Sequence, residues 1–168
     1  MNLRRLILSV LVGMSLGYSS AFAATDAVDM AAAATVYKTE CGACHVAYPG
    51  GFLPEASWNA ILNKLDDHFG DNAELDAEAL QSIQSYLQVD NYDRSNIRRR
   101  TRGRFDTPGT PIRVTDTKIF QAMHREISEK RVKNNPQVKT FARCEACHRG
   151  AENGNFSESQ VRIPRGGA

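Results

Sequence analysis

A chain of 168 residues, 42% of them hydrophobic and 24% charged, is long enough for one globular domain or two small lobes and no more. Its formal net charge of +2 comes from two arginines near the N-terminus, because residues 24–168 carry 19 basic and 19 acidic side chains. These charges are unevenly divided. Residues 24–93 hold 12 acids and 2 bases, whereas residues 94–168 hold 7 acids and 17 bases. Such asymmetry is informative about partners and about how the two halves meet.

Residues 1–23 have the pattern of a secretory signal peptide. Arg4 and Arg5 give a charged start, an apolar run follows from residue 6 to residue 16, and Ala21-Phe22-Ala23 is a small-x-small cleavage sequence. The apolar run is too short and too interrupted for a good transmembrane span, although an uncleaved membrane anchor is the alternative. We therefore expect export to the periplasm, cleavage after Ala23, and membrane contact only through a partner.

All four cysteines belong to two C-x-x-C-H motifs, the pattern that attaches c-type haem. The motifs run from Cys41 through Cys44 to His45 and from Cys144 through Cys147 to His148. Two thiols one helical turn apart can add to the two vinyl groups of one haem, and the next histidine then becomes the proximal iron ligand. A thioredoxin-like redox pair and a Cys₄ zinc site also use C-x-x-C spacing, but neither explains the histidines. The sequence predicts two covalently attached haem c groups.

His68 is the candidate sixth ligand for the first iron. Apolar residues recur at helical spacing from Trp58 to Phe69, and His68 lies on the same face. Ser57 can cap this helix and Gly70 can close it. A buried imidazole needs a partner, and a haem iron is a suitable one.

His124 is the candidate sixth ligand for the second iron. It borders the apolar face of a predicted helix that either Asp116 or Thr117 can cap. The neighbouring Met123 is a rival, since methionine also binds haem iron and raises its potential. Sequence spacing favours pairing within each lobe, although crossed pairing between the lobes stays open.

The coarse pattern predicts an all-α fold, with two small helical haem lobes joined by a basic linker. We expect an N-terminal lobe over 24–93, a linker over 94–115, a C-terminal lobe over 116–150 and an irregular tail over 151–168, either loose or a strap. Further helices are predicted over 27–38 and from Asp76, and Pro136 should separate two helices of the second lobe, with residues 138–147 leading into the second motif. Aromatic and apolar side chains of the loop at 48–54 should line a haem edge.

Six arginines lie between residues 94 and 104. They can pair with haem propionates, form a docking patch for an acidic partner, or be a solvated linker. Nucleic acid is not an expected partner, because the protein is expected outside the cytoplasm.

These residues together resemble the bacterial dihaem cytochrome c family. The resemblance covers about residues 37–150, and its more specific parts are the Pro-Gly-Gly-Phe-Leu-Pro segment at 49–54 and His68-Phe69-Gly70. It implies a small periplasmic electron carrier with His45 and His68 on one iron and His148 and His124 on the other. It also implies a membrane cytochrome b or quinol-side donor and a small c-type haem protein as acceptor.

We therefore expect a monomeric electron-transfer protein with two six-coordinate, low-potential haems and no catalytic site. One alternative is a dihaem subunit that delivers electrons to a periplasmic reductase, for which a stable large partner would be the sign. The other is a ligand-binding haem protein with one open iron.

Overall fold

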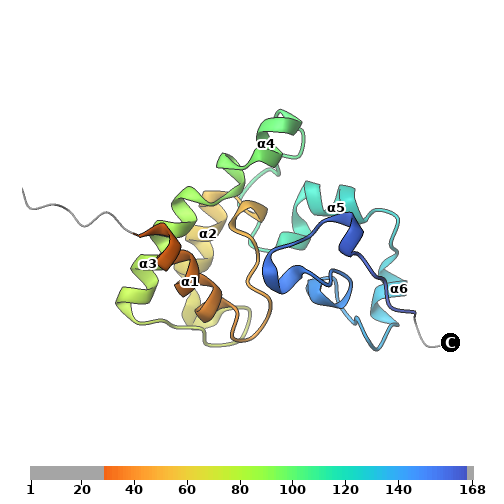
Figure 1. The fold of residues 1–168 in the computed structure, drawn as a ribbon, viewed down its shortest axis with the longest axis horizontal. Helices are drawn as coiled ribbons and strands as arrows, with labels where there is room; N and C mark the ends of the chain where they lie inside the picture. Colours follow the sequence, from red (N-terminus) through yellow and green to blue (C-terminus); the bar gives the residue numbers. More distant parts are fainter. Residues whose placement is uncertain (1–28, 166–168) are drawn as a thin grey trace, which may run out of the picture.

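The computed structural model describes residues 29–165, which form helices and turns and no β-sheet (Figure 1). The predicted all-α class is confirmed. The predicted signal peptide, residues 1–23, lies outside the described residues, and no described helix is long and apolar enough to cross a membrane. The α-helices are α1 (Met30–Cys41), α2 (Glu55–Leu62), α3 (Ala77–Val89), α4 (Asn96–Thr101), α5 (Lys118–His124) and α6 (Glu129–Lys133).

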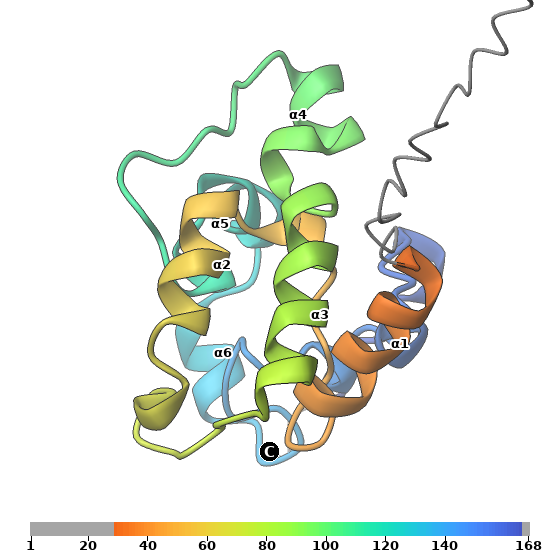
Figure 2. The same ribbon diagram turned by 90° about the vertical axis from the view of Figure 1, so that its left-hand side faces the viewer.

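The first lobe is built on α3, which lies between α1 and α2 (Figure 2). Asp76 caps α3 by accepting a hydrogen bond from the Ala79 amide at 2.8 Å, as predicted. Asp29 caps α1 in the same way, so the predicted helix over 27–38 begins and ends three residues later. The lobe's buried core consists of Tyr37, Leu53, Trp58, Leu62, Ile83 and Leu87.

The single helix predicted from Ser57 to Phe69 is wrong. Helix α2 begins at Glu55 and ends at Leu62, with Ser57 buried inside it rather than capping it. Lys64 leaves the helical conformation at φ −139°, and a short 3₁₀ turn over Leu65–Asp67 follows. Leu65 still packs against the core, so the apolar residues keep their helical spacing although the helix itself has ended. Apolar spacing alone therefore does not reveal where the helix stops.

The basic linker contains a helix that the sequence analysis did not predict. Ser95 caps α4 by accepting a hydrogen bond from the Arg98 amide at 3.1 Å, and α4 protrudes from the body of the molecule (Figure 1). The Arg98 guanidinium donates two hydrogen bonds to Asp106, at 3.1 and 2.8 Å, and holds the pKa of that carboxyl below its usual range. The linker is therefore folded back on itself rather than extended.

The second lobe is mostly turns around α5 and α6. Thr117 is the cap of α5, one of the two residues predicted for that role. A helix over residues 138–147 does not form, because Lys139 has a φ of +67° and only a 3₁₀ turn, Cys144–Ala146, precedes the end of the second motif. Pro136 therefore separates α6 from a region of turns and not from a second helix.

The tail is a strap over the second motif. Its Arg162 amide donates to Cys147 O at 2.8 Å, and Gln160 O accepts from the Arg149 amide at 3.2 Å. Nearer the end, Pro164 O accepts a hydrogen bond of 3.0 Å from the buried side chain of Asn135. The sequence left open whether the tail is a loose end or a strap, and these contacts are those of a strap.

Candidate haem sites

The first site is assembled at the end of α1. Cys41 is the last residue of that helix, and a Cβ on Gly42 would lie 2.2 Å from Lys38 O, so the close turn that follows requires glycine. The turn carries Cys44 and His45, and both are exposed.

His68 reaches the first site from the 3₁₀ turn after α2. Its ring lies opposite the His45 ring, with centroids 6.3 Å apart and planes inclined by only 18°. The loop between α2 and α3 thus brings together two histidines that are far apart in the chain.

The second site joins the end of α5 to the second motif. His124 is the last residue of α5, and its ring centroid lies 6.0 Å from that of His148, with the planes inclined by 66°. The structure therefore brings the histidines together in the uncrossed arrangement, one pair in each lobe. Met123 lies beside His124, but 67% of its surface is exposed, so the arrangement favours His124 as the ligand.

Both histidine pairs have the spacing that an iron between two imidazoles requires. Ring nitrogens that bind one metal ion from opposite sides, each about 2 Å from it, place the two ring centroids about 6 Å apart. The observed separations of 6.3 and 6.0 Å agree with this distance. The residues present therefore fit a haem at each site.

One ring in each pair is oriented by a backbone hydrogen bond. His45 Nδ1 donates to Val46 O at 2.8 Å, and His124 Nδ1 donates to Phe120 O at 2.9 Å. Because a carbonyl oxygen only accepts, Nδ1 carries the proton and Nε2 keeps the lone pair that a metal needs. The other ring of each pair has no such anchor within residues 29–165, and His148 Nδ1 is buried without a partner.

The same two unanchored histidines have lowered pKa values. Burial lowers the pKa of His68, with smaller contributions from His45 and Arg113, while Asp71 acts in the opposite direction. Burial and the neighbouring His124 lower the pKa of His148. Both shifts favour the neutral form, in which histidine binds a metal.

The first thiol of each motif lacks the lowered pKa of a redox-active C-x-x-C pair. Burial, followed by the nearby Glu40, raises the pKa of Cys41 to about 11. Burial and then Glu145 likewise raise the pKa of Cys144 to about 11. Thioredoxin-like motifs instead lower the pKa of the attacking thiol. Residues 29–165 also contain no group of three or more histidine, cysteine, aspartate or glutamate side chains arranged as a metal site.

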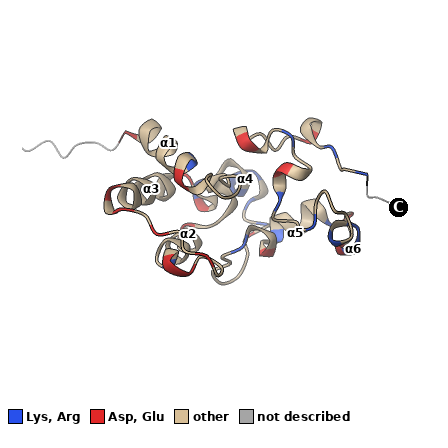
Figure 3. Cartoon of the chain, turned by 90° about the horizontal axis from the view of Figure 1, so that it is seen from below, with Lys and Arg blue, Asp and Glu red and all other residues tan. Residues whose placement is uncertain are grey.

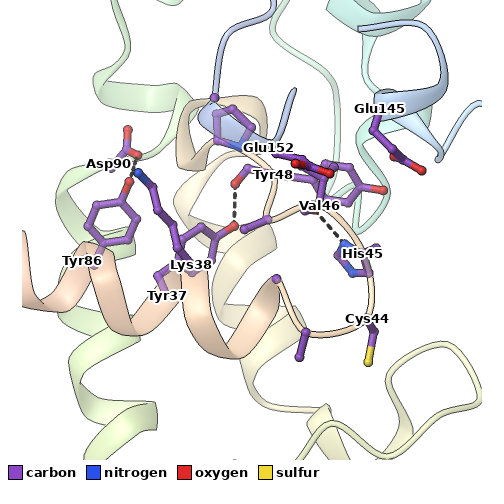
Figure 4. A pocket seen from close by; sticks show the side chains of 15 residues that line it. Tyr37, Lys38, Cys44, His45, Val46, Tyr48, Tyr86, Asp90, Glu145 and Glu152 are labelled. Carbon is purple, nitrogen blue, oxygen red and sulfur yellow. Dashed lines mark hydrogen bonds between the residues drawn. The ribbon is translucent and has the colours of Figure 1, made fainter. Parts of the chain in front are cut away.

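Tyr48 connects the two attachment motifs. Its ring lies against the His45 ring with centroids 5.0 Å apart, and its hydroxyl donates to Ala142 O at 2.9 Å, two residues before Cys144. Burial, with the nearby Cys144 and Glu145, raises the pKa of Tyr48 to about 12, so the hydroxyl remains a donor at neutral pH. A hollow of about 630 Å³ opens beside this contact (Figure 4). Neither His68 nor the second histidine pair lines it, so the hollow lies beside the ligand pairs and not between them.

An aromatic contact from the tail also joins the lobes. Phe52 of the first lobe meets Phe156 edge to face at 4.9 Å, and Phe156 in turn lies 5.3 Å from the His148 ring. The sequence predicts that the loop at 48–54 lies beside a haem, but it gives no sign of the Phe156 contact, because the tail has no periodicity. Of the linker arginines, only Arg98 forms a salt bridge among the described residues.

Three solved structures resemble the chain, and a family model described as dihaem cytochrome c matches residues 37–156. A diheme cytochrome c of Shewanella baltica OS155 is 36% identical, with a TM-score of 0.65 over 80% of this chain and 96% of that one. A diheme cytochrome c from Rhodobacter sphaeroides is 38% identical, with a TM-score of 0.63 over 73% of this chain and 95% of that one. No curated protein matches the chain.

Proposed function

Because the chain belongs to the dihaem cytochrome c family and is thus an electron-transfer haem protein with two c-type haems, we propose that it is a periplasmic carrier. In this proposal each of the two irons is closed by a pair of histidines. Cys41 and Cys44 attach the first haem, and Cys144 and Cys147 attach the second. The single observation that carries the proposal is the pair of facing imidazoles in each lobe, at the spacing of two axial ligands.

The haem supplies an iron that takes up and releases one electron. The chain's own residues determine what else happens at each site. His45 and His124, whose Nδ1 atoms are held by backbone hydrogen bonds, would bind iron through Nε2, and His68 and His148 would supply the other histidine ligand at each site. With both faces occupied, neither site leaves a position for a small-molecule substrate. Two histidine ligands also favour a lower potential than histidine with methionine.

Carbon monoxide binding tests this proposal directly. We expect the absorption spectrum of the dithionite-reduced protein to stay unchanged immediately after carbon monoxide is added, because both sixth positions are held by strong protein ligands and carbon monoxide can bind only as slowly as a ligand leaves. A shift in half of the haem signal would show one open iron, and the protein would then be a ligand-binding haem protein instead of a closed carrier.

The surroundings of the two sites carry opposite charge, which supports separate docking partners. Lys and Arg are sparse in α1–α3 and frequent from α4 onward (Figure 3). Exposed acids surround the loop of His68, including Asp66, Asp67 and Asp71, whereas exposed bases follow His124, including Arg125 and Arg131. We propose that the first haem exchanges electrons with a basic partner surface and the second with an acidic one.

We expect the reduction rate of the first haem by a cationic ruthenium ammine complex to fall as salt is raised. Screening shortens the reach of exposed charges from about 30 Å at 0.01 M to about 8 Å at 0.15 M ionic strength. Stopped-flow absorbance measures the rate, and the variant carrying Asp66→Asn and Asp67→Asn should lose much of the salt dependence. A wild-type rate that does not respond to ionic strength would contradict steering by this surface.

By family resemblance, we propose a membrane cytochrome b or quinol-side protein as the donor and a small c-type haem protein as the acceptor. Nucleic acid is not a proposed partner, and the carrier is proposed to act as a monomer. Purification of the native protein bound to a large reductase would favour the alternative role of an electron-delivering subunit.

A further inference from the structure

Phe69, next to the proposed iron ligand His68, has an unusual conformation. Its φ is +61°, in the left-handed region that a bulky residue rarely adopts, and 44% of its surface is exposed. Reciprocal backbone hydrogen bonds between His68 and Asp71, at 2.7 and 3.3 Å, close the turn around it. Neither iron ligation nor burial of the ring accounts for an aromatic side chain in this position.

The Phe69 ring lies between His68 and a residue from the distant linker. Its edge meets the His68 ring, with centroids 4.8 Å apart and planes inclined by 65°. The Arg113 guanidinium lies over the same ring, 4.1 Å from its centroid. That distance is well within the range of a cation–π contact. Arg113 is itself held in place, because the next residue, Val114, packs against the first-lobe core.

Packing must orient the His68 ring. No described residue forms a hydrogen bond with either of its nitrogens, in contrast to the Nδ1 anchor of His45. The Phe69 ring packs against the His68 ring, and the Arg113 guanidinium lies over the Phe69 ring.

We propose that Phe69 and Arg113 form a latch that holds His68 over the first iron. Both are positioning residues, and the proposal rests on the histidine ligation proposed above. The segment that begins with Arg113 continues through the cap Thr117 into α5 and ends at His124. The latch arginine and the proposed ligand His124 therefore lie in one continuous segment.

The latch is tested with Arg113→Gln and Arg113→Lys in the haem-loaded full chain. Lysine retains the positive charge but not the planar stacking of arginine. Comparison of the two variants therefore distinguishes a latch from a purely electrostatic effect of Arg113 on the first haem. Arg104→Gln is the matched control, because the Arg104 guanidinium lies 5.9 Å from the ring centroid of its neighbour Phe105, and Phe105 makes no aromatic contact with His68 or Phe69 among the described residues. Arg113 and Arg104 are both exposed, so neither change should prevent folding.

The measurements are the rate of carbon monoxide binding to the reduced protein and the midpoint potential of each haem. Loss of a cation–π contact corresponds to a roughly 2- to 30-fold increase in the fraction of molecules in which His68 has left the first iron. We expect that increase in the slow rate of carbon monoxide binding to the first haem for Arg113→Gln, a smaller increase for Arg113→Lys, whose ammonium can still lie over the ring, and no change for Arg104→Gln. Only Arg113→Gln, which removes the charge, should also shift the potential of the first haem.

The outcomes separate the latch from the function on which it rests. If both Arg113 variants bind carbon monoxide as slowly as the wild-type protein, the latch is wrong and the closed carrier stands. If only Arg113→Gln differs, and only in potential, Arg113 acts through its charge and the latch is again wrong. If the wild-type first haem already binds carbon monoxide rapidly, the closed ligation and the latch fail together.

Discussion

Replacing His68 with alanine converts the first haem from a closed, low-spin state to an open, high-spin one. We expect a high-spin absorption band for one of the two haems and carbon monoxide binding at that haem after reduction. The reason is geometric, because the His68 ring is the imidazole that faces His45, with centroids 6.3 Å apart. Absorption and electron paramagnetic resonance spectra of the oxidised protein measure the change.

The second haem of the same variant serves as the internal control. His124 and His148 lie in the other lobe, so their low-spin signal should remain. An Asn72→Ala variant, altered at an exposed position in the same loop, should keep both haems low-spin. A fully low-spin spectrum in His68→Ala would show that a different residue is the sixth ligand of the first iron.

His124→Ala is expected to open the second haem in the same way. The His124 ring is oriented by its hydrogen bond to Phe120 O and faces His148, whereas the adjacent Met123 is 67% exposed. Met123→Leu should therefore leave the spectra and both potentials unchanged. Absorption spectroscopy with a redox titration distinguishes the two residues.

A rise in the potential of the second haem in His124→Ala, with retention of the low-spin signal, would mean that Met123 has replaced the lost histidine. The double variant with Met123→Leu would then become high-spin. A large change in the single variant Met123→Leu would instead make Met123 the native ligand.

The sequence predicts the parts of each site that depend on local spacing. The two C-x-x-C-H motifs identify six residues without reference to the fold, and helical periodicity correctly placed His124 in a helix, of which it is the last residue. Periodicity also selected His68, but for an incorrect structural reason. The helix stops at Leu62, and a 3₁₀ turn brings His68 to His45.

Contacts between distant segments could not be predicted in this way. Phe156 lies in a tail with no periodic pattern, yet it contacts the His148 ring. The contact between Arg113 and Phe69 joins residues 44 positions apart, and neither type of side chain signals the other in a single sequence. The linker helix was missed because six arginines suggest a solvated segment, whereas the cap Ser95 and the pair of Arg98 with Asp106 stabilise a short helix.

The strap over the second motif has a consequence for the order of maturation. The buried core of the first lobe is complete at Leu87, and both of its histidines precede that residue. The second motif, in contrast, receives the hydrogen bond to Cys147 O only when Arg162 has been synthesised. The first-lobe core can therefore form without the tail, while Cys144 and Cys147 remain accessible for haem attachment until the tail packs against them. The second haem site thus depends on the tail, whereas the buried core of the first lobe does not.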